Sequence, residues 1–172
     1  KSNDLPINHY IYLNNQPQQI ERVRLLSLIP EDSSFRYWRS DKKISKKWNE
    51  VKFNDNKWSL TNHDNWSSFT SSIRSVYFRY GFEMNNEDLI ASFGFALHFI
   101  GGVVIYLNGQ QVLSLNMPSS WNSGTFAVED EDYSEWTHFT ISKDYLTAGM
   151  NILAIELHCL SSQINQPISF DL

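Results

Sequence analysis

Two tryptophans lie in polar segments whose composition suits the recognition of a sugar. Trp66 and Trp121 each have serine and asparagine as neighbours, Asn122 among them. An indole ring can stack on the apolar C–H face of a pyranose, while amides and hydroxyls exchange hydrogen bonds with the hydroxyl groups of the sugar. We therefore predict that Trp66, Trp121 and Asn122 contact a ligand. The alternative is that each indole packs beneath its own loop.

A catalytic role finds little support among the remaining polar residues. The acidic run Glu129–Asp132 is consecutive, which is typical of a solvated loop and unlike the separated carboxylate pair of a glycosidase. The sequence has no nucleophile elbow, no paired His–Glu motif for a metal and no glycine-rich phosphate loop. We therefore expect a domain that binds a ligand and is not an enzyme.

The overall composition narrows the choice of partner. With 172 residues, of which 41% are hydrophobic, the chain is long enough for one well-packed domain. Its net charge of −5 disfavours nucleic acid, which requires a basic surface, and the lysine cluster at residues 42–47 is expected to be a solvated loop. No apolar run approaches the roughly 20 residues of a membrane-spanning helix, so we expect no membrane span.

Two local features concern the thiol chemistry and the compartment, and only the second bears on the compartment. Cys159 is the only cysteine, so no internal disulfide can form, and its apolar neighbours predict a buried, unreactive thiol. The triplet Asn65-Trp66-Ser67 is an acceptor for N-glycosylation, which favours a secreted or cell-surface protein.

Short stretches of alternating apolar and polar residues predict β-strands along most of the chain. Asn108-Gly109 is expected to join two of them in a hairpin through a type I′ turn, since both residues tolerate positive φ. The segment Gln16–Gln19, which contains a proline, is expected to interrupt the strands. Without any long helical period, this pattern predicts an all-β antiparallel sandwich. Ile7–Leu13 is expected to be either an outer strand or an ordered linker. The predicted strands are Ile20–Ile29, Phe35–Trp38, Val76–Phe82, Leu89–Ile100, Val103–Leu107, Gln110–Leu115, Trp136–Ile141, Asn151–Leu160 and Ile168–Leu172.

Three segments between the strands are expected to be turns or loops. In Phe53–Trp58, the asparagine and aspartate side chains are expected to bond the backbone of a turn that the two aromatic residues anchor. Asn62–Ser72 and Asn116–Asp132 are long polar loops, and each holds one of the two candidate tryptophans. Long loops in a compact domain are commonly functional.

In the order of its segments, the chain from Phe35 to Leu172 resembles the galactose-binding-domain-like jelly rolls. The chain departs from the family pattern at Ile100-Gly101-Gly102, where an acidic residue usually precedes the hairpin glycine, and residues 1–30 show no resemblance. The similar segments are Trp48 with Phe53–Trp58 (like W…FDDSxW), Val76–Phe82 (like YFRKTF), Gly102–Gly109 (like DGAVVYLNG), Leu146–His158 (like L..GENVLAVELH) and Ile168–Leu172 (like DISFDL).

This resemblance implies an antiparallel jelly-roll β-sandwich with a lectin-like function. Many carbohydrate-binding modules and accessory domains of glycosidases share this fold, so a glycan or polysaccharide is the expected partner, within a larger secreted or surface protein. The alternative is a protein–protein interaction or assembly module with the same fold. Residues 31–172 would form the sandwich, and residues 1–30 an N-terminal arm or extra strands of the same compact domain.

The resemblance also adds candidate site residues. In several sugar-binding relatives the ligand lies on the sheet face, or at the end of that face, from which Arg79 and His158 are expected to project. Their structural alternatives are an ion pair of Arg79 with Glu156, and a hydrogen-bonded strand histidine at position 158. Asp55 either caps its turn or binds a structural Ca²⁺, as loop carboxylates do in related domains. No other cofactor is expected.

Overall fold

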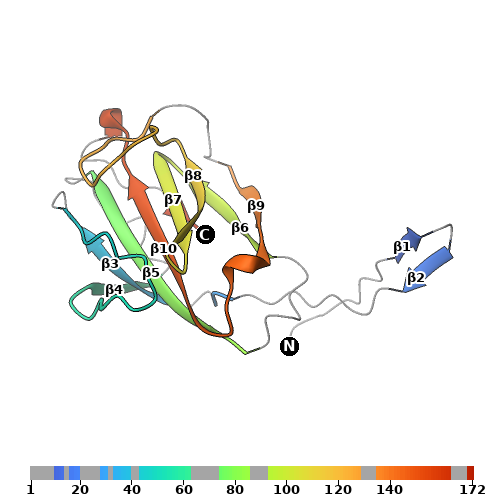
Figure 1. The fold of residues 1–172 in the computed structure, drawn as a ribbon. Coiled ribbons are helices and arrows are strands. Elements are labelled where there is room, and N and C mark those ends of the chain that lie inside the picture. The colour runs from blue at the N-terminus through green and yellow to red at the C-terminus, as the bar shows by residue number, and fades with distance from the viewer. Residues whose placement is uncertain are drawn as a thin grey trace.

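The protein is a two-layered sandwich of antiparallel strands (Figure 1), seen here in a computed structural model that describes residues 10–13, 16–19, 28–30, 33–39, 43–62, 74–85, 93–128, 135–163 and 170–172. One layer is a six-stranded sheet in the order β4-β3-β5-β10-β7-β8, and the other a three-stranded sheet in the order β11-β6-β9. The predicted all-β antiparallel sandwich is therefore confirmed. The elements are β1 (Tyr10–Leu13), β2 (Gln16–Gln19), β3 (Ser34–Arg39), β4 (Ser59–Asn62), β5 (Ser75–Met84), β6 (Phe93–Phe99), β7 (Gly102–Leu107), β8 (Gln110–Leu115), β9 (Thr137–Ile141), the 3₁₀-helix η3 (Lys143–Tyr145), β10 (Gly149–His158), the 3₁₀-helix η4 (Ser161–Gln163) and β11 (Phe170–Asp171).

The main hydrophobic core lies between the two sheets. Side chains alternate along each strand, so every second residue points inward, as the sequence pattern predicted for β5, β6 and β10. Phe78 on β5, Leu97 on β6 and Ile155 on β10 are almost completely buried there. Burial of each such side chain contributes roughly 1.5–3 kcal/mol to the free energy of unfolding, which makes this core the main source of stability.

A second, smaller cluster covers the outer face of the six-stranded sheet. Residues 43–58, here called the covering segment, place Trp48 and Trp58 against Tyr77 of β5. The Trp48 ring packs edge-on against the ring of Tyr77, with 5.0 Å between centroids, and against the ring of Tyr106 of β7 at 5.5 Å. The six-stranded sheet is therefore covered on both faces, and polar side chains on its outer face must find partners within the protein.

The hairpin between β7 and β8 follows the prediction from Asn108-Gly109. Both residues have positive φ, 54° and 87°. The Asn108 side chain also ties the turn to β10, because its Nδ2 donates to Asn151 Oδ1 at 2.7 Å and its Oδ1 accepts from the backbone N–H of Ile152 at 2.9 Å. The turn therefore fixes the end of the hairpin against the central strand.

Some local expectations differ from the structure. Gln16–Gln19 does not interrupt the strands but forms β2, which pairs with β1 in a separate two-stranded sheet. Both strands of such a sheet are edge strands, so it tolerates Pro17, which has no N–H to donate. Leu28 and Ile29 form a bend before Pro30, not a strand, while residues 20–27 lie outside the described residues. Residues 63–73, with Trp66, also lie outside them. The division at residue 30 stays a prediction.

No helix in the part of the chain that the structure describes is both long and apolar enough to cross a membrane. Cys159 is buried, as its apolar neighbours predicted.

Asn108→Ala should destabilise the domain by about 2 to 3 kcal/mol, because alanine loses the side-chain hydrogen bonds and is strained at positive φ. Asn108→Gly removes the same hydrogen bonds without the strain, so it should cost about 1 kcal/mol less. Urea unfolding of both variants checks this difference. Equal losses would show that the left-handed backbone at this position costs nothing.

Candidate functional site

Glu156 lies at the centre of a polar cluster on the outer face of the six-stranded sheet. Because Leu153, Ile155 and Leu157 of β10 point into the main core, Glu156 and His158 point outward. Glu156 is opposite Tyr77 of β5 in the ladder, and it is only 5% exposed. A carboxylate buried to this degree needs hydrogen-bond donors.

Donors reach this carboxylate from several elements. The Tyr106 hydroxyl of β7 donates to Glu156 Oε2 at 3.3 Å, and the Trp121 indole N–H donates to the same oxygen at 3.4 Å. The other oxygen, Oε1, lies 2.9 Å from His158 Nε2. Burial, together with the nearby Glu156 charge, raises the pKa of Tyr77 and of Tyr106 far above the ordinary tyrosine range.

The geometry defines the tautomer of His158. Its Nδ1 lies 2.7 Å from the backbone carbonyl oxygen of Thr125, and a carbonyl can only accept, so Nδ1 carries a proton. The contact between Nε2 and Glu156 then requires one further proton, shared between the ring and the carboxyl group. The histidine therefore links the strand to the loop that contains Thr125.

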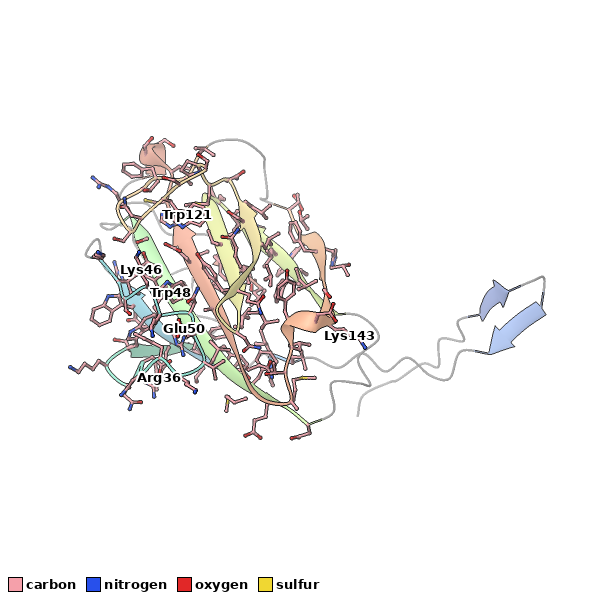
Figure 2. All side chains as sticks on the ribbon, in the orientation of Figure 1. Arg36, Lys46, Trp48, Glu50, Trp121 and Lys143 are labelled. Atoms are coloured by element: carbon pink, nitrogen blue, oxygen red, sulfur yellow. The ribbon has the colours of Figure 1, made fainter. Side chains whose placement is uncertain are left out.

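Residues 116–128 form this loop, here called the Trp121 loop, and further contacts hold it on the sheet. Ser75 Oγ of β5 donates to the Ser123 carbonyl oxygen at 2.9 Å. The Ala127 N–H donates to the Cys159 carbonyl oxygen, just beyond β10, at 3.0 Å. Figure 2 shows Trp121 near the C-terminal end of β10.

Trp121 and Asn122 lie where the Trp121 loop meets solvent. Trp121 is half-buried and Asn122 is exposed. Asn122 Oδ1 accepts from the Gly124 N–H at 2.8 Å, so the amide nitrogen is the donor that this side chain can offer to a ligand. The alternative of an indole packed beneath its own loop holds only in part, since one edge of the Trp121 ring is anchored while the residue remains partly exposed.

Gly102 lets the Trp121 loop approach the sheet, and Gly101 lets the chain just before β7 approach the end of β10. A Cβ on Gly102 would lie 2.5 Å from Met117 Sδ and 2.9 Å from the Asn116 carbonyl oxygen. Gly101 has a φ of +108°, and a Cβ there would lie 2.4 Å from the His158 carbonyl oxygen. The family pattern has an acidic residue immediately before the hairpin glycine Gly102, so the departure at Gly101 coincides with the close approach to β10.

Arg79 lies on the same sheet face but belongs to a different group of contacts. It is 3% exposed, its Nε donates to Asp55 Oδ2 at 2.9 Å, and its guanidinium also donates to the carbonyl oxygens of Trp48 and Glu50. The interpretation that Arg79 pairs with Glu156 is therefore wrong. The reason is the strand register, which places Ala154 opposite Arg79.

Asp55 links two arginines rather than capping its turn. Its Oδ1 lies 3.3 Å from Arg36 Nε and its Oδ2 2.9 Å from Arg79 Nε. The turn is capped instead by Asn54, whose Oδ1 accepts from the Asn56 N–H at 3.0 Å. Within the described ranges, no group of three or more His, Cys, Asp or Glu side chains could hold a metal ion, and calcium at Asp55 stays a prediction.

The structure thus brings together three of the candidate residues, Trp121, Asn122 and His158, and places Arg79 under the covering segment. Trp66 lies outside the described residues. Sequence reasoning missed Glu156 as the centre of the site, together with its donor Tyr106. The available signal was a glutamate and a histidine two residues apart on the outer face of an otherwise apolar strand.

Comparison with known proteins gives fold relatives only. No protein-family model matches the sequence, and no curated protein matches it. A glycosyl hydrolase family 2 member from Bacteroides cellulosilyticus matches with a TM-score of 0.50 and 14% identity, over 80% of this chain and 18% of that chain. A β-glucuronidase from Bifidobacterium dentium, complexed with coumarin-3-O-glucuronide, matches with a TM-score of 0.48 and 14% identity, over 76% of this chain and 20% of that one. The chain therefore spans at most about a fifth of the length of these enzymes, and the likeness shows the fold.

Gly102→Ala should lower the free energy of unfolding by about 1 to 3 kcal/mol, because the new Cβ would collide with the backbone of the Trp121 loop. Gly81→Ala is the matched control, since a Cβ there would meet the flexible ends of Ile152 and Met150 at 3.4 Å and the Asn151 carbonyl oxygen at an ordinary 3.9 Å. Urea unfolding and the tryptophan emission spectrum check both variants. A Gly102→Ala protein as stable as the control would contradict the close approach.

The stability of the domain should fall as the pH rises above about 10. Tyr77 and Tyr106 keep their protons in the folded state at a pH at which the unfolded chain loses them, so alkaline pH favours unfolding. Titration of tyrosinate absorbance compares the wild type with Tyr77→Phe. In urea the variant should lose one eighth of the amplitude, since the chain has eight tyrosines, whereas in the folded state near pH 11 the two proteins should agree. A difference in the folded state would show that Tyr77 is accessible to base.

Proposed function

We propose that this chain is a non-catalytic, lectin-like domain that binds a glycan or polysaccharide through Trp121 and Asn122. The observation that carries the proposal is a partly exposed indole whose N–H is fixed by a buried carboxylate. The remaining ring surface can stack on the C–H face of a pyranose, and the Asn122 amide can donate to a sugar hydroxyl.

The fixed orientation of Trp121 favours binding. A surface tryptophan that is free to rotate loses side-chain entropy when a ligand immobilises it, at a cost of about 0.5–1.5 kcal/mol. The hydrogen bond to Glu156 and the attachment of the loop through Ser123 and Thr125 restrict the indole before any ligand arrives. Such preorganisation favours binding, because less side-chain entropy remains to be lost when a ligand stacks on the ring.

The buried candidates have an indirect role in this proposal. His158 and Arg79 are 2% and 3% exposed, so they would support the binding surface from beneath. Trp66 would supply a second stacking surface, and Asp55 a calcium ligand. The Asn65-Trp66-Ser67 triplet supports secretion or surface display, and the family 2 glycosyl hydrolase likeness supports a place within a larger protein that acts on carbohydrate.

Exposed apolar residues at the edge of the six-stranded sheet favour a second candidate, an interaction or assembly module. Leu60 on the edge strand β4 is 64% exposed, and Trp38 of the adjacent strand β3 is also exposed. An unpaired edge with apolar side chains can bind another chain. Sedimentation at increasing concentration distinguishes this candidate, because self-association that Leu60→Lys abolishes would favour it over glycan binding.

Trp121→Ala should weaken glycan binding about tenfold or more, which corresponds to ~1.4 kcal/mol, because it removes the stacking surface. A glycan array, followed by titration with lactose and soluble plant and bacterial polysaccharides, measures the effect. Trp136→Ala is the matched control and should leave binding unchanged, since Trp136 is 51% exposed and lies just before β9 of the other sheet. Saturating glycans without any response from the wild type, or equal losses in both variants, would contradict the proposal.

A further inference from the structure

Side chains from three strands and from the Trp121 loop surround the Glu156 carboxylate. Tyr77 comes from β5, Tyr106 from β7, His158 from β10 and Trp121 from the loop. The carboxylate itself is buried, so a sugar stacked on the indole would not reach it. Its effect on a ligand would therefore pass through the side chains that it holds.

The contacts of Glu156 depend on the position of its two oxygens. Oε2 must lie where both the Tyr106 hydroxyl and the Trp121 N–H can donate to it, and Oε1 must lie 2.9 Å from His158 Nε2. A glutamine could satisfy all of these partners. Its Oε1 would accept from the tyrosine and the indole, and its NH₂ would donate to Nε2, which is free to accept because the carbonyl of Thr125 keeps the ring proton on Nδ1.

A shorter side chain with the same charge could not do so. Aspartate lacks one methylene, which withdraws both oxygens by about 1.5 Å and breaks the hydrogen bonds to the indole and to His158. Buried donors without an acceptor would then favour a different arrangement of the Trp121 loop. Position and charge can therefore be separated at this residue.

We propose that Glu156 is a positioning residue of the glycan site, which holds the Trp121 indole and the Trp121 loop in the orientation that stacks on a sugar. The inference rests on the proposed function and deepens it, because it assigns the stacking geometry to one buried side chain. It is the placement of the carboxyl oxygens, more than their negative charge, that fixes this orientation.

The test compares Glu156→Gln with Glu156→Asp. Two readouts are needed: affinity for lactose and soluble galactan, and acrylamide quenching of Trp121 without ligand, taken as the difference between each protein and its Trp121→Phe counterpart. Glu83→Gln and Glu83→Asp, at an exposed position on β5, are the matched controls. Circular dichroism and thermal unfolding confirm that each protein is folded.

Glu156→Gln should keep affinity within about threefold and leave the quenching of Trp121 unchanged. Glu156→Asp should lose about tenfold in affinity and make Trp121 easier to quench. A Glu156→Gln protein with weaker sugar affinity or stronger quenching of Trp121 would overturn the inference, even if the aspartate variant does not fold. A folded Glu156→Asp protein that matches the wild type in both readouts would overturn it as well. If the wild type binds neither lactose nor galactan, the proposed function is contradicted for these galactosides. The quenching comparison then still decides whether Glu156 positions the indole.

Discussion

The burial of the Glu156 carboxylate between the six-stranded sheet and a loop is the constraint on which the candidate site depends. A charged or proton-sharing group in such a place is stable only when donors surround it, and a donor lost from one side leaves an uncompensated polar atom. Tyr106 and Trp121 supply those donors, and His158 shares a proton with the carboxyl group, so the partners come from three different parts of the chain. The conformation of the loop is therefore tied to the central strand and not left to the loop's own sequence.

The second anchor on this face follows the same principle. Arg79 is buried beneath the covering segment, and its guanidinium is satisfied by the Asp55 carboxylate and by two backbone carbonyl oxygens. The Phe53 ring of the covering segment packs on the guanidinium, with 5.3 Å to the ring centre. One buried acid and one buried base thus fasten two separate segments to the outer face, while the inner face is largely apolar. The inner face supplies stability, and the outer face determines where the connections lie.

Much of the fold could be predicted from the sequence, because alternation along a strand is a local property. The inward faces of β5, β6 and β10 and the turn at Asn108-Gly109 follow directly from residue types. The register between strands is not a local property, and this is why Arg79 was wrongly expected to pair with Glu156. The ladder places Tyr77 opposite Glu156 and Ala154 opposite Arg79, so the acid and the base lie in different rows of one face. A shift of two residues along either strand would have brought the expected pair together.

Exposure alone does not identify the binding tryptophan in this protein. Trp136 is more exposed than Trp121, and its ring makes a tilted contact with the ring of His98, with 5.9 Å between centroids. Trp121 has a directional hydrogen bond to a buried carboxylate, in a loop held at several further points. An exposed ring offers contact area to a ligand, but the entropy lost when the ligand immobilises the ring reduces the binding free energy gained from that area. The anchored indole is therefore the better candidate, even though it presents the smaller surface.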